Sequence, residues 1–222
     1  SQEMVTAQDI DRVYRAAHSA AVKFVPVDAF IICLMDENLE EAEDVYLVDK
    51  ERRPPKVRSP LSERALLRRV VESGEPVLIQ DFPRGALGED IGPATAVEDG
   101  KFTRSILAVP LMINGRPIGM ISAQHYAPDM YTPEHVQAMV ILANQVAIVI
   151  EHTRLVQSYR LRVAALNAAA NTIVITDREG RVEWANPAIT RLTGYTLEEA
   201  RGRNFGRMLK SGLQENPFYE NM

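Results

Sequence analysis

Cysteine is nearly absent from this chain of 222 residues, which contains only Cys33. One cysteine excludes a disulfide within the chain and any metal site built on a cluster of cysteines. It also leaves a thiolate nucleophile without the resolving thiol that disulfide-type redox turnover needs. Cys33 lies in the apolar run 28–35, so we interpret it as a small core residue.

The chain has no excess of basic charge and no long hydrophobic run. Lys and Arg number 25 against 30 Asp and Glu, which gives a net charge of −5 and does not favour a nucleic-acid partner. The longest apolar stretch, about 13 residues interrupted by Asn144 and Gln145, is too short for a membrane span. The N-terminus lacks the regions of a signal peptide. We therefore expect no nucleic-acid partner, no membrane span and a cytoplasmic location.

Glycine and proline are absent between Pro133 and Gly180, and this gap predicts one long helix over residues 131–170. Thr132 suits the N-cap, Pro133 the first helical position, and Glu134 the positive end of the helix dipole. At 1.5 Å per residue the helix would be roughly 55 Å long.

The apolar positions of this helix favour two interpretations. A spacing of three and four residues is typical of a coiled-coil seam, with one face on the chain's own sheet and another on a second copy. This reading predicts a homodimer through a signalling helix that uses Met139, Leu142, Val146, Val149, Val156 and Val163. The alternative is a core helix followed by an exposed linker helix.

Before the long helix, the pattern predicts an α+β domain with an antiparallel sheet backed by its first and last helices. We expect helices at 7–25 and 61–73, the latter with Arg64, Arg68 and Arg69 on its outer side. Strands are expected at 28–35, 45–48 and 77–79, then a long loop at 80–103 and a hairpin. Asn114-Gly115 between two apolar runs marks the hairpin turn.

The residues 105–111, Asn114-Gly115, 118–122 and 131–134 resemble the signature of a GAF domain. The resemblance covers about residues 7–155, and we place the domain at 1–150. It implies a pocket for a small molecule such as a cyclic nucleotide, a tetrapyrrole or an amino acid, or no ligand at all.

The second part of the chain resembles the front half of a PAS domain. The resemblance rests on the strand 171–177, the turn 178–181, and the run from Trp184 to Ala200. Thr196 and Glu199 have the spacing of a capping box. We therefore expect a linker helix at 151–170 and the N-terminal half of a PAS domain at 171–222. Because two strands bury little surface, we expect poor order or borrowed packing beyond about Phe205.

The candidate ligand pocket joins the long loop to the facing strands. We assign to it Asp81, Phe82, Arg104, Ser122 and Gln124. The alternative is that these polar residues are edge or solvent positions, since spacing alone does not show that side chains converge.

The resemblances also indicate which cofactors the chain does not suit. The loop 80–103 has no cysteine for covalent bilin attachment, and Phe205 stands where a flavin-adduct cysteine would follow Asn204. Residues 187–209 contain no histidine for haem ligation, and the four histidines of the chain do not have the spacing of metal ligands. No catalytic constellation is apparent, so we expect no enzyme activity in this chain and leave the cofactor open.

Two sensor-type modules joined by a helix resemble the input part of a bacterial signalling protein, such as a sensor histidine kinase or a diguanylate cyclase or phosphodiesterase. We therefore expect a sensory input module that binds a small molecule or partner and relays the signal through a dimeric helix. The alternative function is a ligand-free dimerisation or interaction scaffold.

Overall fold

The computed structural model describes residues 2–82, 96–97 and 101–209. The chain divides into two compact units, Ser1–Arg154 and Leu155–Met222. The mixture of helices and antiparallel strands confirms the predicted α+β class. Most of the predicted long loop at 80–103 lies outside the described residues. Its described parts include two short strands, β5 (Ala96–Val97) and β6 (Lys101–Phe102).

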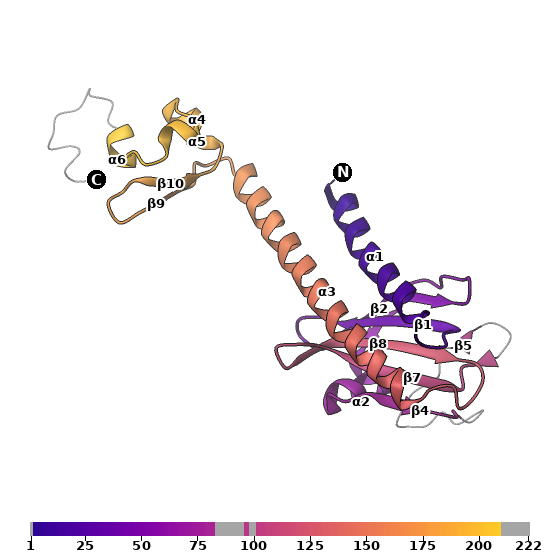
Figure 1. Cartoon of the computed structure of the whole chain (residues 1–222). Coiled ribbons are helices and arrows are strands. Elements are labelled where there is room, and N and C mark those ends of the chain that lie inside the picture. The colour runs from indigo at the N-terminus through magenta and orange to yellow at the C-terminus, as the bar shows by residue number, and fades with distance from the viewer. Residues whose placement is uncertain (1, 83–95, 98–100, 210–222) are drawn as a thin grey trace. The chain divides into compact units, whose positions relative to one another are not determined.

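The first unit is built on one antiparallel sheet with the strand order β3-β2-β1-β8-β7-β4 (Figure 1). Its strands are β1 (Ala29–Met35), β2 (Glu41–Asp49), β3 (Arg58–Pro60), β4 (Val77–Ile79), β7 (Ser105–Ile113) and β8 (Arg116–His125). The turn between β7 and β8 confirms the predicted hairpin. Asn114 and Gly115 both have positive φ angles, of 49° and 77°, as a tight two-residue hairpin turn requires.

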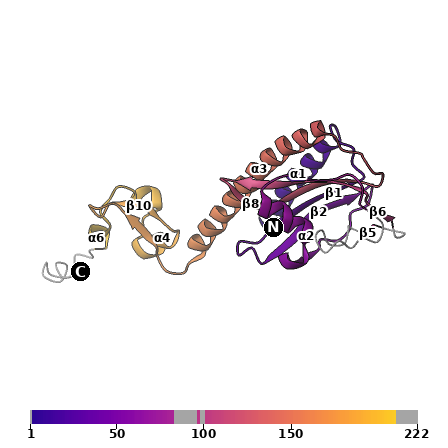
Figure 2. The same cartoon turned by 90° about the horizontal axis from the view of Figure 1, so that it is seen from below.

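Helices cover both faces of this sheet. Helices α1 (Gln2–Ala21) and α3 (Pro133–Ala168) lie on one face, and α2 (Ala65–Ser73) lies on the other, as Figure 2 shows. The core beneath α1 and α3 includes Phe30, Ile121 and Ala123, and the core beneath α2 includes Cys33 and Met120. The two cores alternate along each strand because successive side chains point to opposite faces.

The sheet edge differs from the prediction. Strand β2 begins at Glu41 rather than Val45, and it pairs with β3, which the sequence did not predict. Glu41 and Glu43 alternate with the buried Ala42 and Asp44, so the acidic start of β2 has the composition of a connecting loop although it lies within the sheet.

The predicted helix 61–73 is interrupted at Arg64. The segment starts as a short 3-10 helix, η1 (Leu61–Glu63), and α2 begins only at Ala65. The expected outer position of Arg64 is wrong, because its guanidinium donates to both carboxylate oxygens of Asp44, at 2.7 and 2.8 Å. Gly74 ends α2 in the left-handed conformation, as expected.

The long helix is confirmed, and α3 begins at Pro133 and ends at Ala168. Met139, Val146 and Ile150 are among its buried residues. The helix is also long and apolar enough to cross a membrane, with a mean hydropathy of 1.4 in its best window. One such helix is weak evidence for a span, because the core helix of a soluble protein passes the same test.

The second unit contains a hairpin and three short helices. These are β9 (Val174–Thr176), β10 (Val182–Ala185), α4 (Ala188–Thr193), α5 (Leu197–Ala200) and α6 (Phe205–Met208). The capping box at the start of α5 is confirmed, because Thr196 and Glu199 each cap the other's backbone N–H. The core is small and centres on Val182 and Ile189. The expectation for the segment beyond Phe205 falls mainly on residues 210–222, outside the described residues.

Candidate functional site

Asp81 and Arg104, two of the five predicted pocket residues, form an ion pair at the surface. Arg104 donates from Nε to Asp81 Oδ1 at 2.8 Å and from Nη2 to Oδ2 at 2.7 Å. These hydrogen bonds raise the pKa of the Arg104 guanidinium. Phe82, which is buried, donates its backbone N–H to the carbonyl of Arg104 at 2.7 Å. The Asp81–Arg104 ion pair and this backbone hydrogen bond therefore connect the end of β4 to the start of β7.

Ser122 and Gln124 form a second group, inside the first unit. Both are buried, and they share a face of β8 with Met120, the face opposite to that of Ile121 and Ala123. Gln124 Nε2 donates to Ser122 Oγ at 3.4 Å, and Gln124 Oε1 accepts from Thr103 Oγ1 at 2.8 Å. We call Thr103, Ser122 and Gln124 the buried polar row.

The structure thus brings the predicted residues together as two pairs in different surroundings. Asp81 and Arg104 lie at the surface, whereas Ser122 and Gln124 lie in the interior. Thr103, directly before Arg104 in the chain, joins the buried row and was not predicted. A threonine at the end of a glycine-rich loop carries no sequence signal of burial. Its position follows from the hydrogen bond across to β8.

A second polar cluster that the sequence did not predict lies beneath β3. Arg64 also donates from Nε to Ser59 Oγ at 2.7 Å and from Nη2 to the carbonyl of Val57 at 2.9 Å. Its Nη1 lies 3.9 Å from Cys33 Sγ. Only the three-dimensional pairing of β2 with β3 brings these residues together.

The interpretation of Cys33 as a core residue is confirmed. Its side chain is fully buried, and burial together with the nearby Asp44 carboxylate raises the pKa of the thiol well above its ordinary value. The neutral thiol is therefore the stable form, and it is a poor nucleophile and metal ligand. Within the described part of the chain, no group of three or more His, Cys, Asp or Glu residues could hold a metal ion.

The structure corrects the position of the predicted seam on α3. Met139 and Val146 are covered by the chain's own sheet, and Leu142 packs partly against the same core. Met139 and Val146 are therefore not free to contact a second copy. Val149 is 43% exposed, and Val156 and Val163 are partly buried. The reason is that a spacing of three and four residues suits packing on the chain's own sheet as well as a coiled-coil seam, and in the first half of α3 this stripe faces the sheet.

Several other apolar residues of α3 are more exposed than Val149. Ile141 and Ile148 are 61% and 63% exposed, and they are seven residues apart. Leu155 lies a further seven residues along the sequence and is 60% exposed. Tyr159 follows four residues after Leu155, and Leu166 follows seven residues after Tyr159. Seven residues are close to two helical turns, so this spacing gathers side chains into one stripe. We call Ile141, Ile148, Leu155, Tyr159 and Leu166 the exposed stripe.

Comparison with protein families gives two matches. A family model described as GAF domain matches residues 7–151. A model described as PAS fold matches residues 160–211. A comparison with curated proteins gave no match.

Several solved structures share the fold of the first unit. A free methionine-R-sulfoxide reductase from Neisseria meningitidis is 22% identical, with a TM-score of 0.50, covering 69% of this chain and 86% of that one. Residues 122–287 of a methyl-accepting chemotaxis protein are 18% identical, with a TM-score of 0.55 and coverages of 66% and 92%. The PixJ GAF domain of Thermosynechococcus elongatus, in its blue-light absorbing form, is 15% identical, with a TM-score of 0.51 and coverages of 72% and 95%. At these identities the likeness concerns the fold alone.

Proposed function

Because residues 7–151 match the GAF model, this chain belongs to the GAF-domain family, and we propose that it is the sensory input part of a signalling protein. GAF and PAS domains are regulatory domain types, and the chain combines a GAF domain with a region that matches the PAS fold. In the proposal, a small molecule binds the first unit in the cytoplasm, and α3 carries the effect to an output domain such as a histidine kinase or a diguanylate cyclase.

One observation carries this proposal, namely that strand β8 faces two environments. Ser122 and Gln124 lie on one face of the strand and belong to the buried polar row. Ile121 and Ala123 lie on the other face and point into the core that holds α3. A ligand that engages the polar row therefore acts on a strand that packs directly against the long helix. Tightly packed cores shift between discrete arrangements rather than deforming continuously. Such coupling is typically worth about 1–3 kcal/mol.

The buried polar row suits a ligand-binding role because its hydrogen-bonding capacity is concentrated in an apolar surrounding. Buried amide and hydroxyl groups cost free energy unless they are paired, and pairing with a ligand can replace pairing within the row. Gln124 supplies both a donor and an acceptor, and the two hydroxyls can do either. We therefore propose a neutral polar molecule rather than an apolar one.

The proposed relay uses a second copy of the chain, which pairs along the exposed stripe of α3. Side chains at heptad spacing on one helix fit the same side chains on an identical helix, and pairing would remove Ile141, Ile148 and Leu155 from water. This replaces the predicted seam, since Met139 and Val146 are already covered.

A thermal-shift screen against metabolites and nucleotides tests the sensory role. A ligand that binds only the folded state stabilises it by about 2.7 kcal/mol at 100 times its Kd, so we expect at least one compound to raise the melting temperature. Ser122→Ala and Gln124→Leu should remove that rise. Gln137→Leu, the same kind of change at an exposed position of α3, should keep it.

The two outcomes separate the sensor from the scaffold. If no compound shifts the melting temperature, the ligand-free scaffold replaces the sensor as the explanation. A shift that survives both Ser122→Ala and Gln124→Leu would place the ligand away from the buried polar row and overturn the proposed site.

A further inference from the structure

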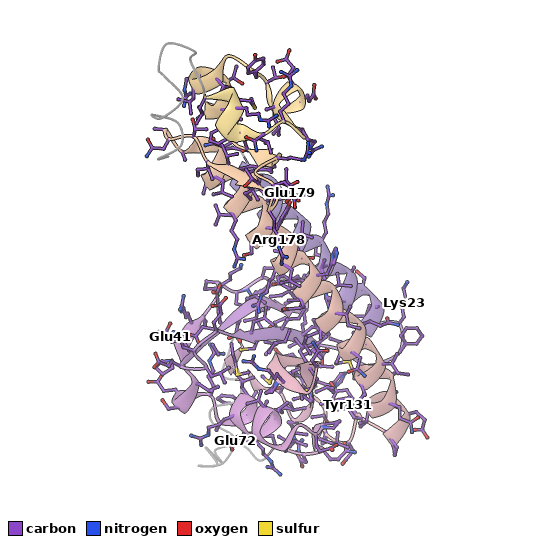
Figure 3. All side chains as sticks on the ribbon, turned by 90° about the vertical axis from the view of Figure 1, so that its left-hand side faces the viewer. Lys23, Glu41, Glu72, Tyr131, Arg178 and Glu179 are labelled. Atoms are coloured by element: carbon purple, nitrogen blue, oxygen red, sulfur yellow. The ribbon has the colours of Figure 1, made fainter. Side chains whose placement is uncertain are left out.

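A polar cavity lies at the surface of the second unit, outside the small core of that unit. Its volume is about 520 Å³, within the range of small-molecule sites. The turn between β9 and β10 forms one wall, and Figure 3 labels Arg178 and Glu179 in this turn. The segment from Gly202 to Met208 forms the other wall, and Tyr195 lies between them.

Hydrogen bonds hold the turn in a fixed shape. Asp177 Oδ1 accepts from the backbone N–H groups of Glu179 and Arg181, at 3.0 and 2.7 Å. Gly180 has a φ of +74°, and a Cβ added there would lie 2.9 Å from Asn204 Nδ2. The positive φ therefore favours glycine, and a Cβ at this position would also displace the Asn204 side chain.

Further hydrogen bonds join the two walls. Asn204 Nδ2 donates to the carbonyl of Glu179 at 2.8 Å, and the N–H of Phe205 donates to the carbonyl of Gly180 at 2.8 Å. The N–H of Val182 donates to the carbonyl of Arg203 at 2.9 Å. The backbone that carries the side chains of the cavity is therefore organised before any ligand arrives.

The lining of this cavity contains three arginines and one carboxylate. Arg181 donates weakly from Nη1 to the carbonyl of Gly202, at 3.5 Å. The guanidinium of Arg203 lies over the ring of Tyr195, 5.0 Å from its centre. Arg207 forms no ion pair with any residue of the described ranges 2–82 and 101–209, and Glu179 is the single acidic residue of the lining. Gathering like charges costs free energy that an anion would offset.

We propose that this cavity binds the phosphate group of a small molecule. Guanidinium groups present paired N–H donors that match the oxygens of phosphate, and several of them around one site give charge-assisted hydrogen bonds. Arg203 is already oriented by Tyr195, so less of its side-chain freedom is lost on binding. This site is separate from the buried polar row, and the chain would therefore respond to two molecules.

Calorimetric titration of the whole chain with inorganic phosphate, at constant ionic strength, tests the proposal. We expect saturable binding to the unaltered chain and at least a tenfold weaker affinity in Arg181→Gln and in Arg207→Gln. Arg178→Gln is the matched control, because Arg178 lies in the same exposed turn but does not line the cavity. Its affinity should stay within about twofold of the unaltered chain, and the far-UV spectra of all variants should coincide.

Two results would overturn the proposal. One is the absence of saturable binding. The other is an equal loss of affinity in all three variants, which would show a general charge effect rather than a site. Gln124→Leu should leave phosphate binding unchanged, so a failure here would not bear on ligand binding by the first unit.

Discussion

His18 is a titratable side chain held against the aromatic core of the first unit. Its ring stacks on Phe30 with the centres 5.0 Å apart, and its Nδ1 lies 3.2 Å from Tyr46 Oη. Burial lowers the pKa of His18, and the Arg53 guanidinium lowers it further. The folded state therefore favours the neutral imidazole.

This environment predicts a loss of stability in mild acid. The unfolded chain takes up a proton at His18 as the pH falls below about 6.5, whereas the folded chain does so only at a lower pH. The unfolded state then binds more protons, so the free energy of unfolding falls from pH 7 to the folded-state pKa. Urea unfolding midpoints of the unaltered chain and of His18→Gln, measured between pH 7 and 5, check this.

The variant should show a flatter pH dependence, because glutamine does not titrate. All other histidines and carboxylates are the same in both proteins, so they cancel in the comparison. Identical pH profiles would show that His18 contributes nothing to the acid response.

Single-residue environments were the part that the sequence predicted least well. The burial of Cys33 followed from its apolar neighbours. Arg64, however, lies in a helical pattern that suits a surface position, and its role depends on Asp44 twenty residues earlier. The burial of Thr103 likewise depends on Gln124 in β8, twenty-one residues later. Pairings between distant segments leave no periodic trace in the sequence.

At the scale of elements, Asn186 holds the junction between the end of α3 and the segment 171–173, both within the second unit. It is fully buried, and its Nδ2 lies within hydrogen-bond distance of the carbonyls of Leu166 at 3.0 Å and Asn171 at 3.0 Å. Its Oδ1 accepts from the N–H of Ile173 at 2.9 Å. One side chain thus adds hydrogen bonds to backbone groups at and just after the helix end, where the regular helical pattern stops.

Asn186→Ala should loosen this junction. The Ile173 N–H and the Asn171 carbonyl lose the partner that Asn186 provides, and a lost hydrogen bond of this kind costs about 1 kcal/mol. Hydrogen exchange should therefore become faster at the amide of Ile173 and in β9, with no change in the sheet of the first unit.

Asn171→Ala is the matched control, because the Asn171 side chain is exposed and its backbone carbonyl is retained. If both variants exchange at the same rate as the unaltered chain, Asn186 does not hold the junction.

The sequence predicted best those turns and helix ends that depend on a few neighbouring residues. The hairpin turn at Asn114 and the start of α3 at Pro133 follow from backbone preferences of a few residues. The sequence did not predict which face of α3 contacts the sheet, because Met139 and Ile141 are equally apolar. Only the packing of the core decides that the first is buried and the second is exposed.

At the scale of the whole molecule, the account rests on a GAF domain whose last helix continues into a second module. The exposed stripe is the feature that the structure of one chain leaves uncovered, and large exposed apolar surfaces usually mark interaction sites. A second copy of the chain would cover it and would give the two sensory units a common helix pair. The proposed relay therefore depends on dimer formation through this stripe.

The most direct test is the mass of the chain in solution by sedimentation equilibrium, for the unaltered chain, Ile148→Glu and Leu161→Glu. Leu161 is the matched control, since it is exposed and apolar but lies roughly 120° around the helix from Leu155. The account predicts twice the chain mass of 24.8 kDa for the unaltered chain and for Leu161→Glu, and a single chain mass for Ile148→Glu. A single chain mass for the unaltered protein, or the same mass for both variants, would contradict it.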